Sequence, residues 1–305
     1  MRSCRQFLPL LMLMLAAAAC TLPGAASPTP FTFPTPNMTL TAIFAPTETP
    51  TPGPTVPPPT AETATPGGAS SPTPGTSVAP TSSVGLIRPN GFPATAQFLP
   101  TPPSIDGDLG DWSGTTFTAS QCVFGCSLYS GENDLSASYY IGYDVSALYL
   151  GVKVKDDQFV QLSTGHLMYK GDDVEIQLDT NLAGDFTDKF LSGDDYQVGM
   201  SAGNFGSHAP EAYRWYPASL QAPLPGVVIK AKQVAGGYTL EAKIPWIVFN
   251  VTPTSGARFG FALSLSDDDL PGSAVQQSLV SSVSTRTLVN PTTWGTLILA
   301  PSGGS

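Results

Sequence analysis

The chain has 305 residues and a formal net charge of −10, because 23 aspartate and glutamate residues outnumber 13 lysine and arginine residues. This acidic balance argues against nucleic acid or an anionic lipid surface as a partner, since both are polyanions. It is compatible with neutral ligands and with hard cations such as calcium.

The first segment predicts export from the cytoplasm. Arg2 and Arg5 precede an apolar run over residues 7–19, which is too short to span a bilayer and fits a secretory signal. Ala17, Ala18 and Ala19, directly before Cys20, resemble the lipobox of bacterial lipoproteins, which implies cleavage before Cys20 and lipid attachment to its thiol. We therefore expect residues 1–19 to be a signal peptide. The chain would then be lipid-anchored at the bacterial cell surface, with the lipid as its only membrane contact. The alternative is a plain secretory signal with an unmodified cysteine.

Residues 20–93 are rich in threonine, proline and serine, and 18 of the 31 prolines of the chain fall between residues 21 and 93. Proline lacks a backbone donor, and the segment has no apolar period, so it cannot build a packed core. We expect a disordered, extended stalk with polyproline II character. The folded domain is expected at residues 94–301, followed by a short tail at residues 302–305.

The cysteines predict one disulfide. Of the four cysteines, Cys4 lies in the signal and Cys20 carries the expected lipid. Cys122 and Cys126 remain in the motif CVFGC, and outside the cytoplasm such a close pair is typical of a small disulfide loop. Its expected role is to hold a local turn.

The folded domain reads as a series of short strands separated by turn residues. We expect strands at residues 137–143, 147–154, 174–178, 196–201, 212–216, 227–234, 238–244, 258–266 and 294–299. No stretch has a sustained helical period. This pattern predicts an all-β fold, an antiparallel β-sandwich or jelly roll.

The strand at residues 174–178 is the centre of the functional argument. Its three apolar residues alternate with Glu175 and Gln177, which indicates one buried face and one polar face. Tyr169 lies just before the strand. A ring beside a carboxylate and an amide is a plausible sugar-facing surface, but the same pattern also describes the ordinary solvated face of a sheet.

Oxygen-bearing side chains follow this strand and suggest a calcium loop. Asp179, Asn181, Asp185 and Asp188 surround a glycine at close but irregular spacing. The spacing does not match the EF-hand pattern. A solvated acidic loop is the alternative, and structural calcium is the expected cofactor of the first interpretation.

The sequence offers little for catalysis. The chain has two histidines, so a histidine-based triad or a multi-histidine metal centre is hard to assemble. Neighbouring acidic residues on a strand face opposite ways, whereas glycoside hydrolysis needs two carboxyl groups across a cleft. We expect no enzymatic activity.

Six motifs occur in an order that resembles the family-nine carbohydrate-binding modules and their DOMON-type relatives. They are IDGDLGDW, YDVSALYLGVKVKDD, GDDVEIQLD, GGYTLEAKIPW, FGFALSLSDDD and NPTTWGTLIL. The resemblance covers nearly the whole folded domain. It implies a β-sandwich, bound structural calcium, and non-catalytic recognition of oligo- or polysaccharide, particularly at glycan ends.

The resemblance also implies where the sugar binds. Tyr169 occupies the place of an aromatic residue that precedes the central strand, Glu175 matches the strand carboxylate, and Gln197 takes the place of a polar partner on the next strand. Leu288 stands where a second aromatic residue is expected, so one wall of the aromatic clamp is absent from that place. With two possible replacements for that wall, Trp215 and Arg286, the candidate sugar-binding residues are Tyr169, Glu175, Gln197, Trp215 and Arg286.

Two other functions stay open at this point. One is a structural or interaction domain whose sugar pocket has lapsed, as Leu288 suggests. The other follows from similar sandwich modules that hold haem b. The possible haem ligands here are Met168, Met200, His166, His208 and Lys170. We expect the protein to be a monomer.

Overall fold

The computed structural model describes residues 85–302. The expected signal peptide, Cys20 and most of the expected stalk lie outside this range. Within it, no helix is long and apolar enough to cross a membrane. The helical segments of this range are short 3-10 turns. They are η1 (Leu109–Asp111), η2 (Gly165–Lys170), η3 (Ala218–Leu220), η4 (Trp246–Phe249) and η5 (Pro291–Thr293).

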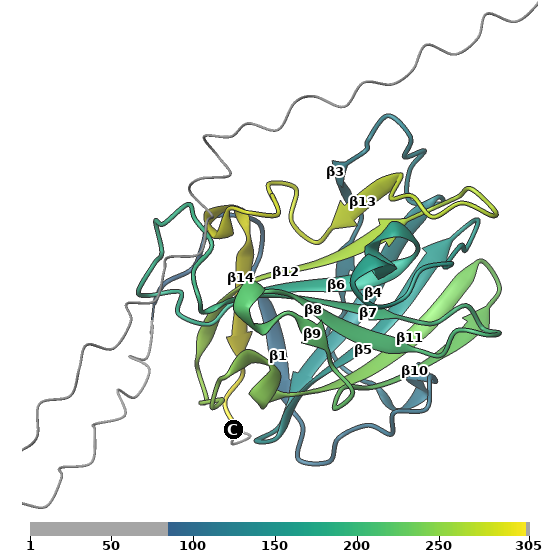
Figure 1. The fold of residues 1–305 in the computed structure, drawn as a ribbon. Helices are drawn as coiled ribbons and strands as arrows, with labels where there is room; N and C mark the ends of the chain where they lie inside the picture. The colour runs from purple at the N-terminus through teal and green to yellow at the C-terminus, as the bar shows by residue number, and fades with distance from the viewer. Residues whose placement is uncertain (1–84, 303–305) are drawn as a thin grey trace, which may run out of the picture. The chain divides into compact units, whose positions relative to one another are not determined.

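Fourteen strands form two layers that are joined at one edge (Figure 1). The first layer runs β10 (Val228–Val234), β11 (Gly237–Pro245), β5 (Ala147–Asp156), β4 (Leu135–Tyr143) and β1 (Ala94–Phe98), with β2 (Phe117–Ala119) also on β4. The second runs β14 (Gly295–Leu299), β12 (Arg258–Asp267), β6 (Asp173–Asp179), β7 (Asp195–Ser201), β8 (Glu211–Tyr216) and β9 (Ala222–Pro223).

The prediction of an all-β sandwich is confirmed, and each of the nine expected strands is present within a few residues of its expected bounds. Four of the other strands bear on the argument. Strand β1 pairs in parallel with both β4 and β14, and thereby joins the two layers. Strand β2 lies on β4. Strand β13 (Ser278–Ser281) pairs with β12, and β3 (Gln121–Phe124) pairs with β13. Figure 1 shows β3 and β13 together at one end of the folded unit.

The core lies between the layers and explains the alternation in β6. Val174, Ile176 and Leu178 are fully buried there, in one hydrophobic cluster with residues of β4, β5 and β11. Burying such side chains stabilises the fold by about 1.5–3 kcal/mol each. Since successive side chains of a strand point to opposite faces, the polar residues of β6 must point away from this core.

Candidate functional site

The polar face of β6 is not exposed to solvent as an ordinary outer sheet face would be. Asp173, Glu175, Gln177 and Asp179 are each at most 2% exposed. Burying charged and amide groups is unfavourable unless they have partners, so their surroundings must supply hydrogen bonds or counter-charges. The interpretation of β6 as the solvated side of a sheet is therefore wrong.

A pocket of about 520 Å³ lies over this face. Its lining residues come from the central strands, from η2, and from the β3–β13 end of the layer. They are Val123, Phe124, Tyr169, Glu175, Gln197, Trp215, Gln276, Leu279, Arg286, Thr287 and Leu288. The volume is within the usual range for small-molecule sites. All five residues that the sequence nominated for sugar binding thus line one pocket.

The floor of the pocket is a connected polar network. The Oε2 atom of Glu175 accepts hydrogen bonds from Nη2 of Arg286 at 3.2 Å, from Nε2 of Gln177 at 3.2 Å and from Nε2 of Gln197 at 3.3 Å. Arg286 also donates from Nε to Oε1 of Gln177 at 3.3 Å. Burial lowers the pKa of Arg286, while Glu175 and Asp173 raise it. The arginine stays charged and holds the carboxylate of Glu175 at a fixed position.

One side of the pocket is aromatic. The rings of Tyr169 and Trp215 meet edge to face, with centroids 6.1 Å apart. Nε1 of Trp215 donates to the main-chain oxygen of His166 at 2.9 Å, and this bond fixes the indole. The indole lies directly over Gly199, where a Cβ atom would be 2.2 Å from Cη2 of the ring. The glycine therefore allows the ring to lie against β7.

The opposite side carries residues that the sequence analysis did not nominate. Phe124 and Leu279 come from β3 and β13, two strands that were not predicted. Leu288 also lines the pocket and is 45% exposed. The motif CVFGC, which contains Phe124, was interpreted only as a turn held by a disulfide. The one signal for Phe124 was an aromatic residue inside that motif.

Asp173 lies beside the polar network but has a different environment. It is fully buried, and neither of its carboxylate oxygens has a hydrogen-bond partner. Burial raises the pKa of Asp173 well above its usual value; Glu175 raises it further and Arg286 lowers it. The protonated, neutral form of Asp173 is therefore favoured.

The expected calcium loop brings only part of its residues together. Asp179 and Asp185 converge with Asp195, and one carboxylate oxygen of each lies within 4.8 Å of the others. Asp188 is outside this group and accepts a hydrogen bond from the amide of Phe190. The main-chain N–H of Asn181 donates a hydrogen bond to Oδ1 of Asp179 in a turn.

Arg88 supplies a cation to this group. Its Nη2 atom is 2.6 Å from Oδ2 of Asp179, and both side chains are buried. Burial raises the pKa of Asp179 to about 7, with Asp185 raising it further and Arg88 lowering it. The expected boundary of the stalk at residue 93 falls after Arg88, which is 1% exposed within the folded unit.

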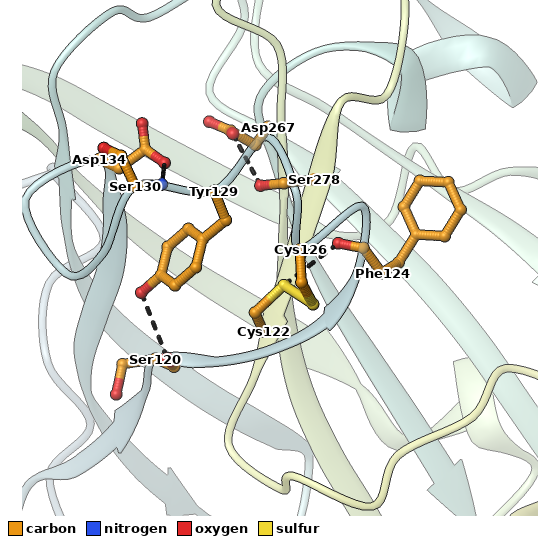
Figure 2. Close-up of a disulfide and its surroundings, with 9 residues drawn as sticks. All are labelled: Ser120, Cys122, Phe124, Cys126, Tyr129, Ser130, Asp134, Asp267 and Ser278. Atoms are coloured by element: carbon orange, nitrogen blue, oxygen red, sulfur yellow. Dashed lines mark hydrogen bonds between the residues drawn. A yellow bond between two sulfur atoms is a disulfide. The ribbon is translucent and has the colours of Figure 1, made fainter.

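A second acidic group includes Asp269, which follows β12 at the end of the β6–β12 pair opposite Asp179. Asp134, Asp157 and Asp269 place one carboxylate oxygen each within 4.8 Å of the others. Asp267 lies near this group without belonging to it: it is 1% exposed, and its Oδ1 atom has no hydrogen-bond partner. Figure 2 shows Asp267 and Asp134 near each other. Burial raises the pKa of Asp267 to about 6, and Asp134 raises it further.

The predicted disulfide between Cys122 and Cys126 is confirmed, with the two Cα atoms 5.7 Å apart. Figure 2 shows the bond at the base of a turn, with the Phe124 ring projecting away from it. Oδ2 of Asp267 accepts a hydrogen bond from the Ser278 hydroxyl at 2.8 Å.

The side chains of the candidate haem ligands do not converge on one site. Met200 belongs to the hydrophobic core between the layers. Met168 is fully buried, whereas His166 is exposed and its ring lies 6.3 Å from that of Tyr213. These surroundings give no positive support to the haem alternative.

Comparison with known proteins decides the family. The family described as "Carbohydrate family 9 binding domain-like" matches residues 105–302, which is most of the described range. The chain belongs to this family. No curated protein matches the chain.

Two solved structures share the fold. Both are family 9 carbohydrate-binding modules from Caldicellulosiruptor kristjanssonii, one in complex with cellotriose and one in complex with glucose. The first is 21% identical, with a TM-score of 0.50, and the match covers 69% of this chain and 94% of that chain. The second is 21% identical, with a TM-score of 0.51, and the match covers 70% of this chain and 98% of that chain.

Proposed function

We propose that this family 9 domain binds carbohydrate without cleaving it, at the outer surface of a bacterial cell. The observation that carries the proposal is the pocket over β6, in which an aromatic side and a charged, hydrogen-bonded floor face the same space. The family assignment and the sugars bound by the two similar modules support the same ligand class.

The chemistry of the pocket suits a sugar ring. A pyranose has apolar faces that pack on aromatic rings and equatorial hydroxyls that need hydrogen-bond partners. Tyr169 and Trp215 offer the rings, and Glu175 offers a charged acceptor. Hydrogen bonds to a charged group are worth about 1.5–3 kcal/mol, roughly twice a neutral one. The fixed position of Glu175 lowers the entropic cost of forming them.

Isothermal titration calorimetry of the full chain with glucose and cellotriose tests this proposal. We expect saturable binding, and we expect Trp215→Ala and Glu175→Gln to weaken it by about tenfold or more, since each removes a major contact. Phe190→Ala and Glu132→Gln are matched controls, because both residues are exposed outside the pocket. Binding that is unaffected by both pocket variants would show that the sugar site is elsewhere.

Calcium is proposed as a structural cofactor, and the second acidic group fits it better than the expected loop. Asp134, Asp157 and Asp269 bring three carboxylates together, and the nearby Asp267 has a buried oxygen without a partner, as do Asp185 and Asp195 of the first group. Calcium takes six to eight oxygen ligands, carboxylates among them. In the expected loop, Arg88 already supplies positive charge to Asp179.

Mutation can distinguish the two acidic groups as candidate calcium sites. Chelation with EDTA should lower the melting temperature of the full chain, because an ion that binds only the folded state stabilises it. Asp267→Asn should abolish this response if the ion is held by the second group, whereas Asp185→Asn should preserve it. The opposite pattern would place the ion at the expected loop, and no response to EDTA in the wild type would reject a structural ion.

The lipid anchor and the stalk complete the proposal. Cys20, preceded by Ala17, Ala18 and Ala19, would fix the chain to the membrane, and the proline-rich segment that follows would hold the sugar-binding domain away from it. This arrangement suits a module that captures glycans outside the cell.

A further inference from the structure

A large aromatic side chain is held in solvent on a tightly constrained turn. Phe124 is 51% exposed at the end of β3. It pairs with Leu279 of β13, and the register shifts before Val280, which pairs with Cys122. The shift leaves Val123 as an extra residue, which is the pattern of a β-bulge. Bulges re-aim side chains, and they recur near functional sites.

Three features fix this turn. The disulfide joins Cys122 to Cys126, on either side of Phe124. Gly125 has a φ of 63° and packs against the next segment so closely that a Cβ atom would be 1.9 Å from the main-chain oxygen of Gln277. The amide of Leu128 also donates to the main-chain oxygen of Gly125 at 2.8 Å. The aromatic ring is therefore presented by a rigid backbone.

The turn stands across the pocket from the aromatic side. On one side of β6, strand β12 pairs with β6, β13 pairs with β12, and β3 pairs with β13. On the other side, β7 pairs with β6 and β8 pairs with β7. Phe124 on β3 and Trp215 on β8 thus flank Glu175 on β6, and all three line the same pocket. Figure 2 shows the ring of Phe124 on the side of its strand away from Tyr129.

We propose that the turn closed by the disulfide forms the second wall of the sugar pocket, with Phe124 packing on the face of the sugar ring opposite Trp215. The proposal rests on the proposed carbohydrate binding and specifies how the ligand is held. Phe124 is the contact residue, and Cys122 and Cys126 are positioning residues that act through it.

The chemistry of this wall sets the ligand class. Phenylalanine has no polar group, and Leu279, its cross-strand neighbour, is also apolar. A hydroxyl that pointed at this wall would lose its hydration without gaining a partner. The pocket should therefore favour a hexopyranose whose hydroxyls are all equatorial, such as glucose, over one with an axial hydroxyl, such as galactose.

Calorimetric titration of the full chain with glucose and galactose tests the inference. We expect Phe124→Ala to weaken glucose binding by about tenfold and to reduce the preference for glucose over galactose. Cys122→Ser with Cys126→Ser should weaken glucose binding by several-fold when Phe124 is present. In the Phe124→Ala background the same two cysteine substitutions should not weaken glucose binding further, because the effects of residues that act through one contact are not additive. Phe190→Ala is the matched control, since this phenylalanine is 78% exposed elsewhere.

The outcomes separate this inference from the proposed function. If the wild type binds glucose and Phe124→Ala binds it equally well, the second wall is refuted while carbohydrate binding stands. If the serine pair weakens binding equally with and without Phe124, the disulfide does not act through that ring, and the proposed positioning role is refuted. If the wild type binds neither sugar, the second wall is refuted, and the cellotriose titration decides whether carbohydrate binding fails with it.

Discussion

Removing the carboxylate of Glu175 should affect stability and sugar affinity by separable amounts. The Glu175 and Arg286 side chains are 2% and 6% exposed, and their charged atoms are 3.2 Å apart. Glu175→Ala would leave the guanidinium buried without its carboxylate partner. Breaking a buried ion pair in this way costs about 3–5 kcal/mol.

The expected loss of unfolding free energy can be converted into a change in melting temperature. For a domain of this size, 1 kcal/mol corresponds to about 2–4 °C, so Glu175→Ala should lower the melting temperature by roughly 6–20 °C. Glu175→Gln keeps an oxygen that can accept from Arg286, so its stability cost should be smaller, about 1–2 kcal/mol. Differential scanning calorimetry of the full chain measures both variants.

Affinity should follow a different pattern from stability. Glu175→Gln loses the charged acceptor and should bind glucose about tenfold more weakly. Glu175→Leu combined with Arg286→Met should recover stability relative to Glu175→Ala, because an apolar pair removes the unpaired charge, but it should not recover binding. A melting temperature unchanged by Glu175→Ala, or glucose binding restored by the apolar pair, would refute this reasoning. Glu132→Gln, at an exposed position, is the control.

Two further predictions follow from the structure and one from the sequence. Gly199→Ala should weaken sugar binding, measured by calorimetry, because its Cβ atom would be 2.2 Å from the Trp215 ring and would displace it; unchanged affinity would contradict the role of this ring. In EDTA, the melting temperature should fall as pH rises from about 5 to about 7.5. The carboxyls of Asp267 and Asp269 have pKa values raised to about 6 and about 7, so the folded state binds more protons than the unfolded state over this range. Millimolar calcium should reduce this fall, and a melting temperature that rises with pH in EDTA would contradict the prediction. Cys20→Ala should move the protein from the membrane fraction to the soluble fraction of cells, and retention in the membrane would argue against a lipid anchor.

The sequence predicted most of the fold because alternation is a local signal. The alternation of apolar and polar residues in β6 predicted which of its faces is buried, and the order of the six motifs predicted the family. The burial of Glu175 on its other face was not predictable from alternation, since the cover comes from residues more than a hundred positions away, such as Arg286.

The parts that were missed depend on non-local contacts. Strands β3 and β13 have only four residues each, too few for a clear period, and they form because β13 pairs with β12 and β3 pairs with β13. That pairing carries Phe124 to the pocket. Arg88 lies in a segment whose composition predicts a stalk, yet its single ion pair with Asp179 fixes it to the folded unit.

The acidic residues show the same limit. The expected calcium loop was chosen because its side chains are close in sequence. The second group gathers Asp134, Asp157 and Asp269 from three separate segments, which only the fold brings together.

The most direct test of the central claim is a calorimetric titration of cellotriose into the full chain and into its Trp215→Ala variant. We predict saturable binding by the wild type and a loss of about tenfold or more in the variant, with Phe190→Ala unchanged. No heat of binding in the wild type at millimolar and higher cellotriose, or equal affinity in wild type and Trp215→Ala, would contradict the proposal that the pocket over β6 is a carbohydrate-binding site.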